Sequence, residues 1–219
     1  MTPEFQADVA KRMREARESS RGYADFFSWS PNRDVEEWSI VKLLSESLAA
    51  ENHCFFCRLE SRGRQNDPPD CEAINLNGER IAIEVTELID GDAIHQFDKA
   101  EEEKRKSPDR AEWSKEKRLE HLQKLSDYAE WPKEKFLDQL QGRLSAKDSR
   151  FPKLQGAPYP GGYLVVVHTD EADLNLETVS GYLDGHRFCA IQHITRAFLL
   201  LSYAPSVDRC PNFELRLDG

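Results

Sequence analysis

Two hydrophobic periods alternate along this chain, one typical of helices and one typical of strands. Over residues 35–51, apolar side chains recur every three to four positions, which predicts a helix with one buried face. The residues of that face are Ile40, Val41, Leu44 and Leu48. Asp34 directly precedes the apolar pattern, so we expect it to cap this helix.

Three strand-like segments follow and predict an antiparallel meander. They cover residues 54–59, 71–76 and 80–88. Asn77-Gly78 joins the last two segments, and the Asn-Gly dipeptide is the strongest short signal of a hairpin. The second segment should therefore fold back along the third.

The second half of the chain predicts helices and strands in alternation. Residues 98–138 hold 23 charged side chains, 12 acidic and 11 basic, which favours an exposed helical insertion with internal ion pairs. A helix over 133–147 is expected to bury one apolar face, made of Phe136, Leu137, Leu140 and Leu144. Four further elements are expected: a central strand at 162–168, a helix within 175–194, a buried strand at 197–203 and an edge strand at 213–217.

This order of elements predicts an α/β fold with a mixed central sheet flanked by helices. A chain of 219 residues fits one domain, which we place at 28–219 with the charged insertion 98–138 inside it. Residues 1–27 are expected to form a helical arm.

Composition excludes some function classes. The net charge of −10 argues against a protein that coats nucleic acid through bulk charge, although a local basic groove stays open. No apolar run approaches the roughly 18 residues of a membrane span, and no secretory signal is visible. We therefore expect a cytoplasmic protein without a membrane partner.

The cysteines raise the question of zinc. Cys54 and Cys57 form a C-x-x-C pair, and Cys189 and His193 have the spacing of one helical turn. On a strand, however, residues three apart face opposite sides, so Cys54 and Cys57 should diverge. This pattern favours buried thiols over a zinc site.

One carboxylate lies in the middle of the third strand segment. Alternation turns Glu84 and Thr86 to the face opposite Val85, where an unpaired charge would be unfavourable. The hairpin brings Asp70 opposite Glu84, and two close carboxylates need a shared proton or a cation. A hard divalent cation such as Mg²⁺ (or Mn²⁺) suits such oxygen ligands. Glu37 shares the inward face of the first helix and offers a third carboxylate.

Pro69-Asp70, the hairpin and Glu84-Val85-Thr86 together resemble the PD-(D/E)XK phosphodiesterase superfamily, which includes restriction endonucleases and repair, recombination and defence nucleases. The resemblance spans roughly residues 34–203 and implies an αβββαβ restriction-endonuclease-like core. It implies that Asp70 and Glu84 hold a metal ion and that Val85 offers its backbone carbonyl. It further implies a metal-dependent endonuclease-like activity on DNA, in defence or DNA processing.

The chain departs from that superfamily at the last motif position, where Thr86 replaces the lysine that positions and activates the attacking water. A neutral hydroxyl can bind a water or a phosphate, but it supplies no positive charge. Some similar proteins with Glu-x-Thr can borrow a lysine from a following helix. Lys147 is the best candidate, because it lies on the apolar face of the helix at 133–147.

Each of these residues also has a purely structural interpretation. Asp70 could be a turn residue, Glu84 a carboxylate paired with an arginine, and Thr86 a strand former without another role. Glu37 and Lys147 could simply complement the dipoles of their helices. A second hypothesis is therefore a catalytically weak or inactive nuclease-fold module that binds nucleic acid or a protein partner. A homodimer is open in either case.

Overall fold

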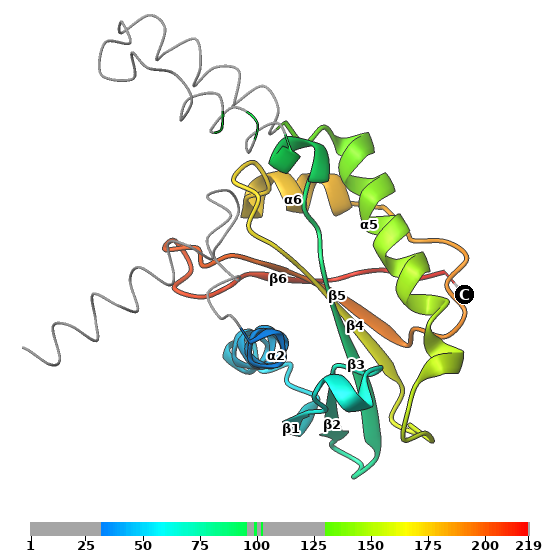
Figure 1. Ribbon diagram of the computed structural model, residues 1–219. Helices are drawn as coiled ribbons and strands as arrows, with labels where there is room; N and C mark the ends of the chain where they lie inside the picture. The colour runs from blue at the N-terminus through cyan, green and yellow to red at the C-terminus, as the bar shows by residue number, and fades with distance from the viewer. Residues whose placement is uncertain (1–31, 96–98, 100–101, 103–129, 219) are drawn as a thin grey trace, which may run out of the picture.

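The computed structural model describes residues 32–95, 99, 102 and 130–218, and this part of the chain is an α/β fold (Figure 1). Its centre is a six-stranded open sheet in the order β1-β2-β3-β4-β5-β6. The strands are β1 (Phe56–Ser61), β2 (Cys71–Asn75), β3 (Arg80–Glu87), β4 (Tyr163–Thr169), β5 (Arg196–Leu201) and β6 (Asn212–Glu214). The helices are α2 (Arg33–Ala50), α5 (Lys133–Asp148) and α6 (Leu176–Leu183), with short 3₁₀ turns η1 (Arg64–Asn66) and η3 (Phe151–Lys153).

The sheet is mixed, as the sequence predicts. Strands β1, β2 and β3 form the expected antiparallel meander, β3, β4 and β5 run parallel, and β6 returns antiparallel to β5. Gly78 takes a φ of 83° in the β2–β3 turn, a left-handed conformation that glycine adopts without steric penalty. The predicted hairpin is therefore confirmed.

The helices cover the two faces of the sheet and create two cores. Helix α2 lies on one face, whereas α5 and α6 lie on the other (Figure 1). Along β3, Ile81, Ile83 and Val85 pack under α2, and Ala82 packs under α5. Glu84 therefore falls on the α5 side in the middle of the sheet, as the alternation predicts.

Several predicted boundaries differ from the structure. Helix α2 is capped by Asn32, whose side chain accepts the N–H of Asp34 at 3.0 Å. Asp34 itself lies in the first turn, so its prediction as the cap was wrong. Pairing with β2 shifts β1 two residues later than predicted, and β6 ends at Glu214.

The predicted arm at 1–27 and most of the predicted insertion at 98–138 lie outside the described residues. The last residues of that insertion, from Lys133 onward, belong instead to α5 and carry the buried Phe136. Among the described helices, none has both the length and the apolar content of a membrane span.

The cysteines only partly match the expectation of buried thiols. Cys71 and Cys210 are buried, but Cys57 and Cys189 are exposed and Cys54 is half-buried. Cys54 precedes β1, which begins at Phe56, so the strand alternation on which that expectation rested does not extend to Cys54.

Candidate active site

The β2–β3 hairpin brings Asp70 and Glu84 together. Cys71 pairs with Ile83, so the residue before β2 lies beside the second half of β3. The N–H of Val85 donates to Asp70 Oδ2 at 2.7 Å, which fixes the carboxylate against the strand. Both side chains are buried, and Glu84 has no exposed surface. The sequence prediction that these two acids are neighbours is confirmed.

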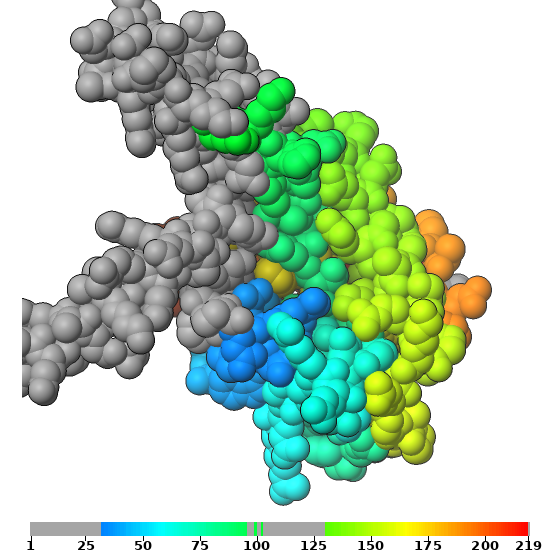
Figure 2. All heavy atoms as spheres, viewed as in Figure 1, coloured from blue at the N-terminus to red at the C-terminus, as the bar shows by residue number. Residues whose placement is uncertain are grey.

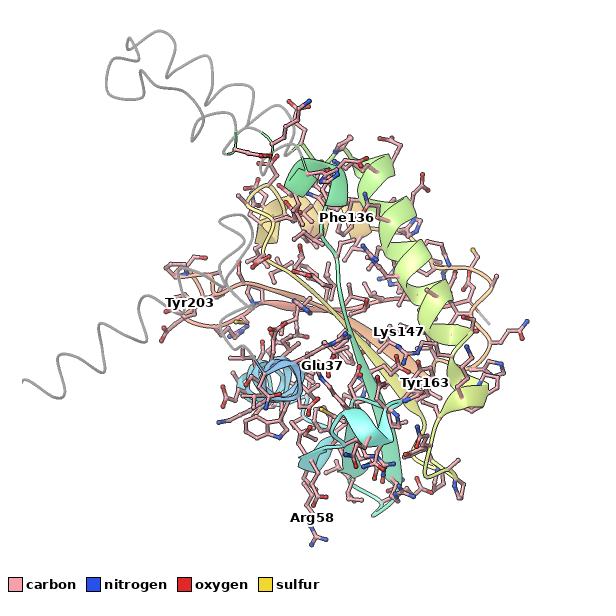
Figure 3. All side chains as sticks on the ribbon, in the orientation of Figure 1. Glu37, Arg58, Phe136, Lys147, Tyr163 and Tyr203 are labelled. Atoms are coloured by element: carbon pink, nitrogen blue, oxygen red, sulfur yellow. The ribbon has the colours of Figure 1, made fainter. Side chains whose placement is uncertain are left out.

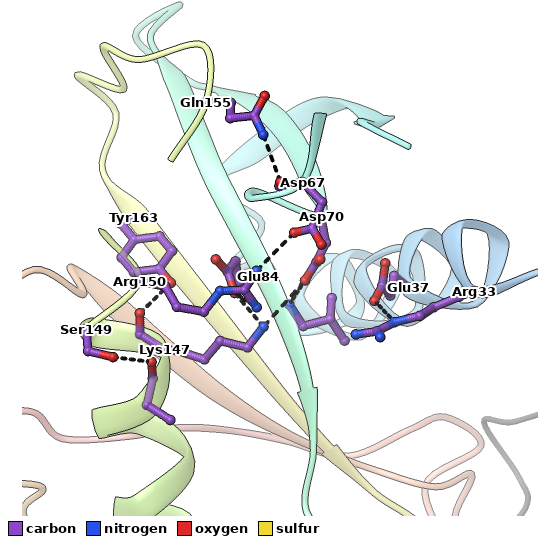
Figure 4. A network of polar contacts seen from close by, with 12 residues as sticks. Arg33, Glu37, Asp67, Asp70, Glu84, Lys147, Ser149, Arg150, Gln155 and Tyr163 are labelled. Atoms are coloured by element: carbon purple, nitrogen blue, oxygen red, sulfur yellow. Dashed lines mark hydrogen bonds and ion pairs between the residues drawn. The ribbon is translucent and has the colours of Figure 1, made fainter. Parts of the chain in front are cut away.

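Lys147 reaches the two carboxylates from the last turn of α5. Its ammonium donates to Glu84 Oε2, and its Nζ lies 3.7 Å from Asp70 Oδ2 (Figure 4). The Tyr163 hydroxyl, from the start of β4, donates to the Lys147 carbonyl at 3.0 Å and fixes the end of the helix. The predicted place of Lys147 is thus confirmed, whereas its catalytic role stays a prediction.

Arg150 is a second cation at the site, and the sequence analysis missed it. Its Nη1 lies 3.2 Å from Glu84 Oε2, and its Nη2 lies 3.2 Å from Asp67 Oδ1. Arg150 follows Lys147 by three residues, in the turn directly after α5, and this turn brings both side chains to Glu84. The three-residue spacing alone did not predict this position, because Arg150 lies beyond the end of the helix. Glu84 therefore pairs with an arginine, as the structural interpretation of this residue from the sequence predicts, and it also pairs with a lysine.

Glu37 approaches from the opposite face of the sheet. It is buried on α2, and its carboxylate accepts from Arg33 Nε at 2.6 Å. In Figure 3 the labelled Glu37 and Lys147 lie on either side of the strands. A cavity of about 270 Å³ connects Glu37 to Asp70 and is lined by Arg33, Asp34, Glu37, Gly63, Arg64, Asp67 and Asp70. The space-filling view shows the blue and cyan atoms of α2 and η1 on the same face as the yellow-green segment after α5 (Figure 2).

Thr86 and Val85 flank the acids on β3. Thr86 is half-buried, and within the described residues its hydroxyl has no hydrogen-bond partner. Val85 is buried, and its N–H already serves Asp70. Alternation keeps Thr86 on the face of Glu84, which is the arrangement that the sequence predicts.

Burial dominates the electrostatics of the three acids. It raises the pKa of Glu84 and of Asp70 above their usual range, while the charge of Lys147 opposes the shift in both. Burial, followed by the charge of Asp70, raises the pKa of Glu37 to about 7, against the lowering effect of Arg33. These acids therefore favour a proton or a cation near neutral pH.

The donor chemistry fits a hard divalent cation. Two carboxylates and a strand carbonyl are oxygen ligands of the kind that Mg²⁺ and Mn²⁺ prefer. Glu84 Oε1 is buried and has no hydrogen-bond partner among the described residues, so it is one oxygen with capacity for a ligand. In the described ranges, however, no three His, Cys, Asp or Glu side chains form a group that could hold a metal. Glu37 is thus not gathered with Asp70 and Glu84 into one group, and the zinc alternative gains no support.

Comparisons with protein-family models, with curated proteins and with solved structures find no match to this chain.

Proposed function

We propose that this protein is a Mg²⁺- or Mn²⁺-dependent phosphodiesterase with endonuclease-like activity on DNA. One observation carries the proposal: the buried ammonium of Lys147 lies between Asp70 and Glu84, at the end of the hairpin. A hairpin with two acids and a lysine is the set of groups in the PD-(D/E)XK superfamily, here with the lysine contributed by α5 in place of Thr86. The order α2, β1, β2, β3, α5, β4 is consistent with the αβββαβ core of that superfamily.

Each residue then has a distinct task. Asp70, Glu84 and the Val85 carbonyl would hold the metal, which when bound lowers the pKa of water and polarises the scissile phosphate. Lys147 would orient the attacking water through its Nζ and place a positive charge beside the phosphate as negative charge develops there. Thr86 offers a hydroxyl on the same face for a hydrogen bond to water or phosphate. Glu37 would tune the charge of the site from the α2 side through Asp70.

A second candidate function has its own support. Glu84 Oε2 is already close to two cations, Lys147 and Arg150, so the described residues balance this charge without a metal. Such a site suits a nuclease-fold module that binds nucleic acid or a protein partner without cleaving. A homodimer, a protein partner and a cytoplasmic location remain predictions.

The test compares wild type with Glu84→Gln, which keeps the shape of the side chain and removes its charge. We expect wild type to cleave plasmid or duplex oligonucleotide with Mg²⁺ or Mn²⁺, and Glu84→Gln to lose at least about 100-fold in rate, because a metal ligand and its charge are gone. Glu60→Gln, an exposed acid on β1, is the matched control and should cleave like wild type. Equal background cleavage by wild type and Glu84→Gln would contradict the proposal.

Calorimetry with Mn²⁺ separates the two candidates. The enzyme hypothesis expects a saturable heat in wild type that is lost in Glu84→Gln and in Asp70→Asn. An absence of Mn²⁺ binding by wild type, together with metal-independent binding of DNA or protein, would favour the binding module.

A further inference from the structure

Arg150 is the more accessible of the two cations at Glu84. Its side chain is 33% exposed, whereas that of Lys147 is 8% exposed. The backbone N–H of Arg150 donates to the Lys147 carbonyl at 2.9 Å, so the end of α5 fixes the backbone position from which the Arg150 side chain extends. The Arg150 guanidinium contacts the carboxylates of both Glu84 and Asp67 (Figure 4).

Both contacts of Arg150 can be replaced. Its contact with Asp67 is a partly exposed ion pair, a class that contributes little to stability. Its contact with Glu84 falls on the same Oε2 that accepts from Lys147, so Glu84 keeps a partner when Arg150 leaves. A planar guanidinium with several donors also matches a phosphate better than a point charge does.

We propose that Arg150 is the phosphate-binding residue of the site and exchanges between two partners. Without metal and DNA, its guanidinium contacts Glu84 and competes with a divalent cation for that carboxylate. When the metal binds Glu84, Arg150 turns to a phosphate of the DNA backbone. This inference rests on the proposed function and adds a residue that the Asp…Glu-x-Lys pattern does not contain.

The proposal predicts two effects of opposite sign in Arg150→Gln. Mn²⁺ should bind about 5-fold more tightly in calorimetry without DNA, because one competing cation is gone. Duplex DNA should bind about 10-fold more weakly, because one phosphate contact is lost. With Ca²⁺ as the divalent ion, the slope of log K against log salt should fall by about 0.9. If Arg150 served only the folding of the protein, its substitution would lower the affinity for Mn²⁺ and for DNA together.

Two further variants control for charge and shape. Arg58→Gln makes the same charge change on an exposed side chain of β1 that points away from the site, and it should leave both affinities within about 2-fold (Figure 3). Arg150→Lys keeps the charge and should restore only part of the DNA affinity.

The outcomes separate this inference from the proposed function. If wild type binds Mn²⁺ but Arg150→Gln binds neither Mn²⁺ more tightly nor DNA more weakly, the inference is wrong and the proposed function stands. Parallel loss of both affinities would also overturn it. If wild type binds no Mn²⁺, both proposals fail.

Discussion

At the scale of single residues, the site is a problem of buried charge. Asp70 and Glu84 lie where an isolated carboxylate would be strongly unfavourable, and Lys147 is buried with them. The contacts among these three side chains offset part of the free-energy cost of removing their charges from water. Removing one partner of a buried ion pair usually destabilises a protein strongly, because the other charge stays buried without compensation. The stability of the protein and its response to metal should therefore depend on the same three side chains.

We expect Lys147→Met to lower the free energy of unfolding by about 3 kcal/mol in the presence of a chelator, because two buried acids lose their closest cation. Mn²⁺ should then stabilise Lys147→Met more than it stabilises wild type, because Lys147 no longer competes with the ion for the two carboxylates. A ligand that binds only the folded state stabilises that state by its binding free energy. Cleavage should be lost even with Mn²⁺ bound. Urea unfolding with and without Mn²⁺, beside a cleavage assay, measures all three.

The control for this variant is Lys133→Met, an exposed lysine at the start of the same helix, which should match wild type. Lys147→Arg should restore little cleavage, because a guanidinium is bulkier and directs its donors differently. A Lys147→Met variant that cleaves at the wild-type rate would remove lysine from the proposed chemistry.

Glu37 gives the site a pH dependence whose sign follows from its raised pKa. Unfolded Glu37 loses its proton near its usual pKa of 4.5, but folded Glu37 keeps the proton up to about 7. Its contribution to stability is therefore complete below pH 4.5 and is lost as the pH rises toward 7. A shift of this size corresponds to at most about 3 kcal/mol, and screening by water at the edge of the cavity makes the loss smaller.

We expect Glu37→Gln to remove this part of the pH dependence, so that its stability relative to wild type rises between pH 4.5 and pH 7. Urea unfolding in a chelator at several pH values measures the change. Glu46→Gln, on the exposed side of α2, should follow the wild-type curve. A Glu37→Gln curve parallel to wild type would mean that Glu37 titrates normally.

At the scale of elements, the site forms where the β2–β3 hairpin meets the end of α5. The hairpin supplies both acids through one strand register, α5 supplies Lys147, and the turn directly after α5 supplies Arg150. Asp148 anchors that turn, because its carboxylate accepts the N–H groups of His193 and Ile194 at 2.7 and 3.0 Å, in the segment before β5. The position of Lys147 thus depends on residues more than 40 positions away in the sequence.

This arrangement explains which parts of the site the sequence predicts. The pairing of Asp70 with Glu84 follows from a local turn and the two-residue period of strands, and both are readable without the fold. The inward direction of Lys147 follows from the helical period. Arg150 lies beyond the last regular turn of α5, where periodicity no longer fixes the direction of a side chain.

Other features depended on competition between neighbours. Asn32 and Asp34 are both good caps, and the extended backbone at Asn32 makes it the cap. Glu37 is buried as predicted, but its bond to Arg33 turns it toward the start of α2 and away from a shared metal group. Arg33 lies one helical turn before Glu37, so this i, i+4 pair follows the helical period, but the predicted helix began only at residue 35 and left Arg33 out.

At the scale of the whole molecule, the net charge of −10 opposes approach to DNA. The cavity beside Asp70 has more acids than bases in its lining, so it would also repel a phosphate without a cation. The described cations nearest the acids, Lys147 and Arg150, are already engaged by Glu84. Binding of DNA should therefore depend on the divalent ion and use few phosphate contacts.

We expect wild type to bind duplex DNA at least about 10-fold more tightly with Ca²⁺ than with a chelator, because the ion replaces repulsion by attraction at the acids. The slope of log K against log salt should be about −2 to −3, which is much shallower than the slope of proteins with about 6–10 phosphate contacts. Fluorescence anisotropy over a salt series measures both values. Asp70→Asn should lose most of the Ca²⁺ effect, and Asp138→Asn, an exposed acid on α5, should keep it. Tight binding in a chelator with a steep slope would instead indicate a basic groove and the non-cleaving module, because such binding needs many phosphate contacts and no metal.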